Sequence, residues 1–264
     1  MDTKQKFRKQ SIKFEPMEQQ HKKKQTKRLI FYIVLLVSFT VVFFVLWFAV
    51  FFKVKSIEID GNLRYSKADI LEAAGIAEGD NLYEIGEKEL NSRLIEALPY
   101  IRSATLERRL PSTLVIGVEE DTAVMYSEIC GDTYLMSEDL TVLERSDSFD
   151  RSKMVELYAG DVSMCYSGKS IEYVDSRMVN VVVKLYAVLK EYGLIDKVNS
   201  FTIKNRFDIQ IRYDDRLDVY FGSVENIDVK VCFFNGILAL LYEDESGRLD
   251  ISDIKEASLH RYDK

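Results

Sequence analysis

An uncharged run of 24 residues, from Leu29 to Phe52, constrains this chain more than any other feature. It reads LIFYIVLLVSFTVVFFVLWFAVFF. As an α-helix the run would be about 36 Å long, enough to cross a hydrocarbon core of roughly 30 Å. A single segment in lipid must be helical, because its backbone groups find no other hydrogen-bonding partners there. We therefore predict a transmembrane helix at residues 29–52.

A cleaved signal peptide is the rival interpretation of this run. Its apolar part would span only about 7–15 residues and would be followed by small residues at a cleavage site. The run is longer than that, and no such small-residue pattern follows Phe52. A buried helix of a soluble protein is also a poor fit, because the run has no polar face. The pattern favours an anchor that stays uncut.

Charge is divided unevenly between the two sides of the run. Residues 1–28 contain ten Lys and Arg against three Asp and Glu, a net charge of +7, whereas residues 53–264 contain 26 against 40, a net charge of −14. The positive-inside rule predicts a cytoplasmic N-terminus and an extracytoplasmic C-terminal part, a single-pass type II topology in the cell membrane. Residues 1–28 are polar and are predicted to be a disordered basic tail. The acidic outer part argues against nucleic-acid binding.

Residues 53–121 carry strand and helix signals in the order β-α-α-β-β. Alternating apolar residues predict strands at 54–60, 103–109 and 114–118. Apolar residues one turn apart predict helices at 66–74 and about 87–97. Ser66 and Asp69 suit the start of the first helix and Gly75 its end, whereas Pro99 stops the second.

This arrangement resembles the FtsQ-type POTRA domain of the bacterial cell-division family FtsQ/DivIB. The resemblance is carried by Val54-Lys55-Ser56-Ile57 directly after the anchor, by Gly61-Asn62, by Pro99 and by Leu110-Pro111 before the last strand. Family members usually show Glu-Arg and then proline at the end of the third strand, where this chain has Glu119-Glu120-Asp121. The resemblance implies an α+β fold with a POTRA-like domain at residues 53–121.

Residues 122–252 are predicted to form a second, β-rich domain with flanking helices. Strand signals occur at 133–136, 140–143, 155–158, 207–213, 217–221 and 248–251, and helix signals at about 175–192 and 226–242. Asp214-Asp215 is predicted to join two of the strands as a hairpin turn. This part resembles the second domain of the same family, and residues 253–264 follow it as a polar C-terminal tail.

The three cysteines, Cys130, Cys165 and Cys232, all follow the predicted anchor. Their apolar neighbours predict small buried thiols. One disulfide with one free thiol is the alternative, since an odd number cannot pair completely. No CxxC pattern occurs, so we expect no metal cluster.

Catalytic patterns are missing from the sequence. It contains no G-x-S-x-G elbow, no Walker A pattern and no GxGxxG motif. His260, in the predicted tail, is the one histidine available to activate an external cysteine. Glu119-Glu120 would point to opposite faces of a strand, which is unsuitable for an acid–base pair. We predict no enzyme activity, no catalytic residue, no cofactor and no small-molecule substrate. A membrane-anchored cell-wall enzyme is the alternative, and loss of activity in cysteine or carboxylate variants would identify it.

The resemblance implies a scaffold of the division machinery (the divisome) at the septum. Its implied partners are bitopic division proteins of the FtsB/DivIC and FtsL type, together with the septal peptidoglycan synthase. In the family a partner adds a strand at the C-terminal edge of the second domain, which corresponds here to residues 247–252. An unpaired strand offers free N–H and C=O groups for such an addition. The candidate partner-binding residues are Tyr242, Arg248, Leu249, Asp250, Ile251 and Tyr262.

Two other interpretations of these residues stay open. Residues 248–251 would otherwise simply complete the sheet, with Tyr242 in the core. A POTRA-bearing chaperone for secreted proteins would bind many unfolded clients weakly instead of one partner tightly.

Overall fold

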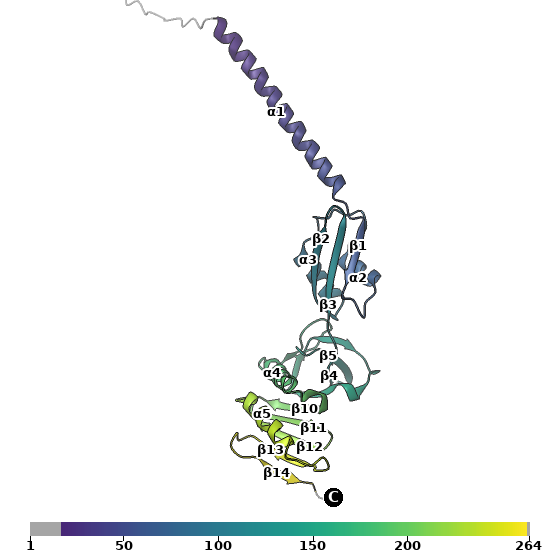
Figure 1. Cartoon of the computed structure of the whole chain (residues 1–264), viewed down its shortest axis with the longest axis vertical. Helices are drawn as coiled ribbons and strands as arrows, with labels where there is room; N and C mark the ends of the chain where they lie inside the picture. Colours follow the sequence, from purple (N-terminus) through teal and green to yellow (C-terminus); the bar gives the residue numbers. More distant parts are fainter. Residues whose placement is uncertain (1–16, 263–264) are drawn as a thin grey trace, which may run out of the picture.

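The chain is elongated, with a long helix at one end and two globular units below it (Figure 1). The computed structural model describes residues 17–262. Two separate hydrophobic cores and two separate large sheets distinguish the units. We call residues 52–121 the proximal unit and residues 122–262 the distal unit.

Helix α1 (Met17–Phe51) contains the apolar segment. Its stretch Leu29–Phe48 has 20 residues with a mean hydropathy of 3.0, and none of it is buried against the rest of the chain. The predicted single apolar helix is thereby confirmed. The helix also extends back to Met17, into the predicted basic tail, whereas residues 1–16 of that tail lie outside the described part.

The proximal unit has the predicted order β-α-α-β-β. Its elements are β1 (Ser56–Asp60), α2 (Lys67–Ala74), α3 (Glu87–Ala97), β2 (Ile101–Arg109) and β3 (Thr113–Glu120). The strand order is β1-β3-β2, with β1 parallel and β2 antiparallel to β3. Both helices supply leucine, isoleucine and alanine side chains to a core that includes Ile70, Leu90, Leu94 and Ile116.

Local chemistry explains the boundaries of the first helix and the turn before it. Ser66 and Asp69 form a reciprocal capping box, and Gly75 ends the helix in the left-handed conformation with φ of 66°. Gly61 has φ of +87°, and a Cβ there would lie 2.2 Å from the carbonyl oxygen of Val118. A glycine is therefore required where the turn after β1 approaches β3.

The distal unit is built on a nine-stranded sheet in the order β14-β13-β12-β11-β10-β7-β4-β5-β6. Its strands are β4 (Met125–Ile129), β5 (Asp132–Met136), β6 (Val142–Arg145), β7 (Val155–Ala159), β10 (Val198–Asn205), β11 (Asp208–Tyr213), β12 (Leu217–Gly222), β13 (Gly247–Asp250) and β14 (Ser258–Arg261). The short strands β8 (Val162–Met164) and β9 (Glu172–Tyr173) pair with each other, and the helices are α4 (Met178–Glu191) and α5 (Ile227–Leu238). Two single 3-10 turns, η1 (Arg151–Lys153) and η2 (Ile195–Lys197), complete the unit.

Helices α4 and α5 pack against one face of this sheet, and the other face is open in its β11–β12 part. In β11 and β12 every second side chain is buried and the side chains between them are partly exposed, as the alternating sequence predicts. The hairpin between these strands turns through Asp214 and Asp215, whose φ angles of 56° and 53° fit a type I′ turn. The core beneath the sheet includes Phe201, Phe221 and Phe234, all fully buried.

The distal unit departs from the sequence-based expectation at several element boundaries. Helix α4 begins at Met178, because Asp175 accepts a hydrogen bond from the backbone N–H of Arg177 in a preceding turn. Helix α5 ends at Leu238 and not at Tyr242. The sequence pattern predicted no strand at the positions of β4, β10 and β14.

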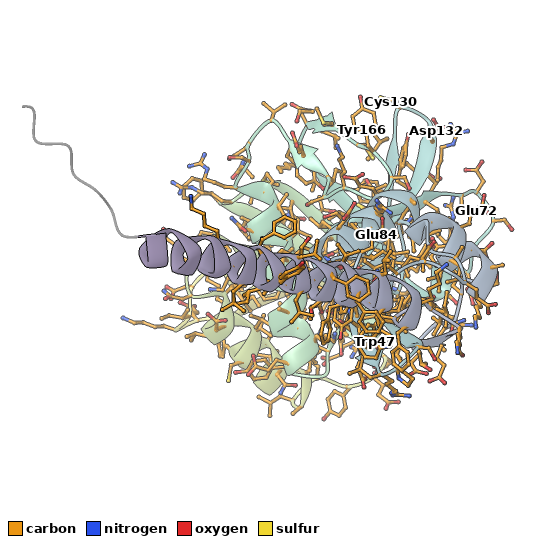
Figure 2. The ribbon with its side chains drawn as sticks, turned by 90° about the horizontal axis from the view of Figure 1, so that it is seen from above. Trp47, Glu72, Glu84, Cys130, Asp132 and Tyr166 are labelled. Atoms are coloured by element: carbon orange, nitrogen blue, oxygen red, sulfur yellow. The ribbon has the colours of Figure 1, made fainter. Side chains whose placement is uncertain are left out.

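The cysteine prediction is wrong for two of the three positions. Cys130 and Cys232 are exposed, Cys165 is half-buried, and all three are free thiols. Cys130 lies in the turn between β4 and β5, at the outer rim of the molecule in Figure 2, with φ of 54°. An apolar neighbour in the sequence is therefore a poor indicator that a cysteine is buried, because the turn places the Cys130 thiol away from the core.

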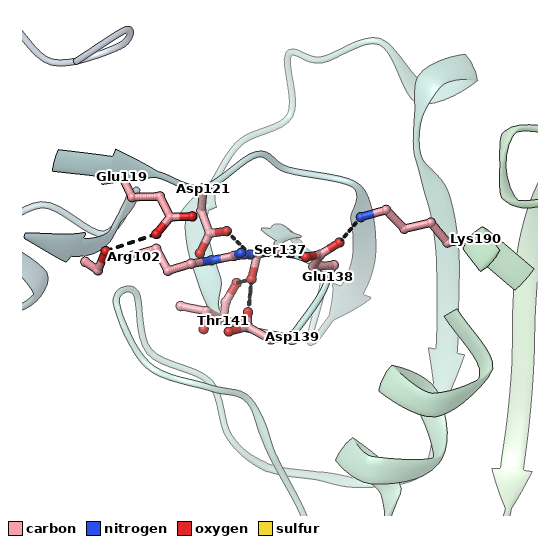
Figure 3. A network of polar contacts seen from close by, with 9 residues as sticks. Arg102, Glu119, Asp121, Ser137, Glu138, Asp139, Thr141 and Lys190 are labelled. Atoms are coloured by element: carbon pink, nitrogen blue, oxygen red, sulfur yellow. Dashed lines mark hydrogen bonds and ion pairs between the residues drawn. The ribbon is translucent and has the colours of Figure 1, made fainter. Parts of the chain in front are cut away.

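A network of ion pairs joins the two units (Figure 3). Arg102 of β2 lies 2.5 Å from Asp121 and 3.5 Å from Glu138, and Glu138 also pairs with Lys190 of α4. Burial raises the pKa of the Asp121 carboxyl although Arg102 acts against it. The hydrogen bond from Lys190 lowers the pKa of Glu138. Of these pairs, Arg102–Glu138 crosses from the proximal to the distal unit, and a partly exposed pair of this kind contributes only about 0–1 kcal/mol.

Candidate protein-interaction edge

The nine-stranded sheet has two edges, β6 and β14, and they differ in how they are covered. The segment after β8 lies along β6: Val142 donates its N–H to the carbonyl of Lys169 at 2.9 Å, and Gly168 donates to Val142 at 2.8 Å. Within residues 17–262, no strand pairs with the outer side of β14. Edge strand β6 is therefore covered at Val142, whereas β14 is open along its length within the described residues.

Strand β14 runs antiparallel to β13, with Leu249 opposite Leu259 and Gly247 opposite Arg261. A Cβ at Gly247 would lie only 2.4 Å from the carbonyl oxygen of His260 and 2.9 Å from the Cα of Arg261. The glycine is thus what allows β14 to come close enough to pair.

Hydrogen bonding around β14 shows which backbone groups remain free. Tyr262 donates its N–H to the carbonyl of Ser246 at 3.2 Å, so the backbone N–H of Tyr262 points inward, toward the β13 side of the sheet. In an antiparallel ladder, residues that bond inward alternate with residues that do not. The N–H and C=O groups of Leu259 and Arg261 therefore point away from the sheet and are available to another strand.

Polar contacts tie the end of the sheet together. Arg261 donates to the Glu245 carboxylate at 2.5 Å, and Arg216 donates to the Glu245 carbonyl at 2.7 Å. The backbone N–H of Tyr242 donates to the same carboxylate at 2.9 Å. The hydrogen bond from Tyr242, with support from Arg261, lowers the pKa of Glu245, so the carboxylate is charged at neutral pH. The loop before β13 is thereby fixed beside the end of β14.

The open face next to this edge carries charged and aromatic side chains. Asp218 accepts from Arg212 at 2.7 Å and from the Tyr262 hydroxyl, and the Arg248 guanidinium lies 5.5 Å from the ring centre of Tyr220. Burial acts to raise the pKa of Asp218, but the hydrogen bonds from Tyr262 and Arg212 outweigh it and the pKa is lowered. The side chains on this face are thus held in place before any partner arrives.

The structure places the six predicted site residues in three different settings. Leu249 and Ile251 are 1% and 0% exposed and belong to the core. Arg248 and Asp250 lie on the open face of β13. Tyr242 and Tyr262 are 76% and 46% exposed, at the end of the sheet. Tyr242 is therefore not a core residue.

The expectation that residues 247–252 form the sheet edge is wrong. β14 covers β13 completely, so β13 is an interior strand paired on both sides. Sequence reasoning missed β14 because Ser258–Arg261 has only four residues and one apolar side chain, too few to show an alternating pattern.

The other chemical features of the described residues are the acidic, histidine and cysteine side chains. Residues 17–262 contain no group of three or more His, Cys, Asp or Glu that could hold a metal ion. Burial raises the pKa of the Cys165 thiol, which keeps it protonated and is opposite to the activation of a nucleophile. The exposed sheet edge is therefore the strongest candidate for a functional site.

Comparison with known proteins shows which family this chain resembles. Residues 52–121 match the model of the POTRA domain, FtsQ-type. The chain is 26% identical over 243 residues to the cell division protein DivIB of Clostridium botulinum strain Hall, which covers 88% of this chain and 90% of that protein. Over most of its length this chain is similar to DivIB and FtsQ cell-division proteins. Its proximal unit is an FtsQ-type POTRA domain.

Two further relatives support the same grouping. The cell division protein FtsQ of Corynebacterium glutamicum is 26% identical over 197 residues, covering 74% of this chain and 82% of that protein. The cell division protein DivIB of Bacillus subtilis is 27% identical over 118 residues, 42% of each chain. The chain is accordingly similar to cell-division proteins, and one helix long and apolar enough to cross a membrane precedes its POTRA domain.

Proposed function

We propose that this protein is a non-enzymatic scaffold of the division machinery that captures a partner by strand addition at β14. Its N-terminus lies in the cytoplasm, and the POTRA domain and distal unit lie outside, at the division septum. The partners are bitopic division proteins of the FtsB/DivIC and FtsL type, with the septal peptidoglycan synthase as a further contact.

The free edge of β14 is the observation that carries this proposal. Its outward groups on Leu259 and Arg261 form a short row of donors and acceptors, and the other edge of the sheet is already covered at Val142. An added strand would satisfy these groups, and side chains beside it would select the partner. Arg248 and Tyr262 on the open face and Tyr242 at the end of the sheet are the nearest candidates for that selection.

The roles of the six candidate residues are revised accordingly. Leu249 and Ile251 support the edge through core packing and do not touch the partner. Asp250 lies opposite Ser258 and on the open face. A proline at Leu249 would remove a ladder donor inside the sheet and disrupt folding, so it cannot test partner binding.

Arg261→Pro tests the proposal, because it removes one outward N–H from an edge strand. The arginine side chain, with its ion pair to Glu245, is lost as well, so Arg261→Ala is the matched control. We expect the proline variant to bind the partner about tenfold more weakly than the alanine variant, since an unmatched hydrogen-bonding group costs about 1–3 kcal/mol. The measurement is the dissociation constant between the full-length chain in nanodiscs and the purified extracytoplasmic part of its FtsB/DivIC-type partner.

Equal affinity of the two variants would rule out strand addition at β14. Weak binding of many unfolded secreted proteins, with no single tight partner, would favour the chaperone alternative. Activity on cell-wall precursors that is lost on substitution of a carboxylate or cysteine would favour the enzyme alternative.

A further inference from the structure

Five aromatic rings meet where α1 enters the POTRA domain. They belong to Trp47, Phe48, Phe51 and Phe52 at the end of the helix and to Tyr83 in the loop between α2 and α3. The Tyr83 ring centre lies 5.3 Å from that of Phe48 and 5.5 Å from that of Phe52, and Trp47 stacks on Phe51 at 4.9 Å. We call this group the aromatic seat.

Backbone hydrogen bonds fix the Tyr83 loop to the end of the helix. Leu82 donates its N–H to the carbonyl of Phe52 at 2.8 Å, and Val54 donates to Asp80 at 2.9 Å. Lys53 and Asn81 form an isolated β-bridge, and Val54 itself is 2% exposed. The helix and the POTRA domain are therefore joined without a flexible linker, and the depth of the helix determines the depth of Tyr83.

That depth places Tyr83 at the membrane surface. The apolar run ends at Phe52, and as a helix its 24 residues are about 36 Å long, about 3 Å longer at each end than a roughly 30 Å hydrocarbon core. With the run centred on that core, Phe48 lies just inside the edge of the hydrocarbon and Phe52 lies about 6 Å further on, within a headgroup layer that adds about 5–7 Å on each side. Because its ring contacts both phenylalanines, Tyr83 lies between the edge of the hydrocarbon and the outer limit of the headgroups.

The side chains around the seat suit this layer. Trp47, Phe51 and Tyr83 are each almost half exposed, at 47%, 48% and 47%. Tryptophan and tyrosine favour the interface because each combines an apolar ring with a polar group. Lys53 and Lys55 follow the helix directly, where their amines can reach lipid phosphates.

We propose that Tyr83 inserts into the phospholipid interface of the same bilayer that holds α1, and that the aromatic seat thereby docks the POTRA domain on the membrane. The occupant of the exposed half of the seat is lipid headgroup and glycerol. Glu84, which follows Tyr83 and is exposed, stays on the water side and limits how deep the loop enters. The docked POTRA domain in turn sets the direction in which the distal unit projects from the membrane (Figure 1).

Tryptophan fluorescence tests the proposal directly, since Trp47 is the one tryptophan of the chain. The full-length Trp47→Phe protein with Tyr83→Trp is placed in phosphatidylcholine and phosphatidylglycerol vesicles that contain a headgroup spin-label quencher. The matched control carries Tyr166→Trp in the same background. Tyr166 is 61% exposed and lies in the distal unit, at the rim of the view in Figure 2 and away from Trp47.

We expect quenching to reduce the emission of the Tyr83→Trp reporter at least about twofold and to leave the control almost unchanged, because an interfacial ring contacts headgroups. Dilution to one protein per vesicle must leave the quenching intact. Equal quenching of the two reporters would overturn the proposal. Quenching that changes on dilution would also overturn it, because a second copy of the chain would then be covering the seat.

Discussion

Gly247→Ala is expected to abolish partner capture while the rest of the distal unit stays folded. The new methyl group would meet the β14 backbone at 2.4 Å from the His260 carbonyl oxygen and 2.9 Å from the Arg261 Cα. Backbone at that distance has to move, so β14 separates from β13 and the docking edge is lost. We expect the affinity for the partner to fall more than tenfold, a cost above about 1.4 kcal/mol.

Hydrogen exchange reports whether the strand has separated. In β13, the amides of Arg248 and Asp250 alternate with the amides that bond to β12, so they face β14. These two amides should lose protection from exchange, whereas the amides of β11 should keep theirs. Gly236→Ala is the control, since Gly236 is exposed in α5 with nothing within 4 Å of its added Cβ. Alanine there should keep full affinity and slightly stabilise the helix.

Unchanged or tighter binding by Gly247→Ala would contradict the account. It would mean that the partner displaces β14 and pairs with β13, the strand favoured by sequence reasoning alone. The glycine variant therefore distinguishes the two possible docking strands.

Phe234→Ala is expected to destabilise the distal unit by about 3–5 kcal/mol, a large part of a typical domain stability. Phe234 is fully buried in α5, and its ring meets those of Tyr213 at 5.2 Å and Phe221 at 6.0 Å, both edge-on. Its loss leaves a cavity between the helix and the sheet. Hydrogen exchange of the β11 and β12 amides in the full-length chain should accelerate at least about a hundredfold.

Phe207→Ala is the matched control for this prediction. Phe207 lies in the turn between β10 and β11 and is 53% exposed, so its loss should change exchange only slightly. The POTRA amides should be unaffected by Phe234→Ala, because the two units have separate cores. Equal acceleration in both units would show that they unfold as one.

The POTRA domain was predictable because its signals are local. The capping box of Ser66 and Asp69, the stop at Gly75 and the leucines of α3 each act within one turn of helix, and all appear in the structure. The alternation in β11 and β12 was equally clear, since one face of the sheet is buried and the other open.

The docking edge was not predictable in the same way. Whether a strand lies at an edge depends on what pairs with it, and β13 is covered by β14, a strand with Leu259 as its single apolar residue. The close approach that permits this pairing depends on the missing side chain of Gly247, which has no distinctive signal in the sequence. The family resemblance pointed to β13 as the edge, and in the structure the edge is the neighbouring strand β14.

Photo-crosslinking in growing cells tests the docking account most directly. The probe replaces His260, an exposed residue of β14, and the control probe replaces Arg145, an exposed residue of β6 at the opposite edge of the sheet. The account predicts that the His260 probe captures one small bitopic division protein and that the Arg145 probe does not. Capture of diverse secreted proteins from His260, or of the same partner equally from both edges, would contradict it.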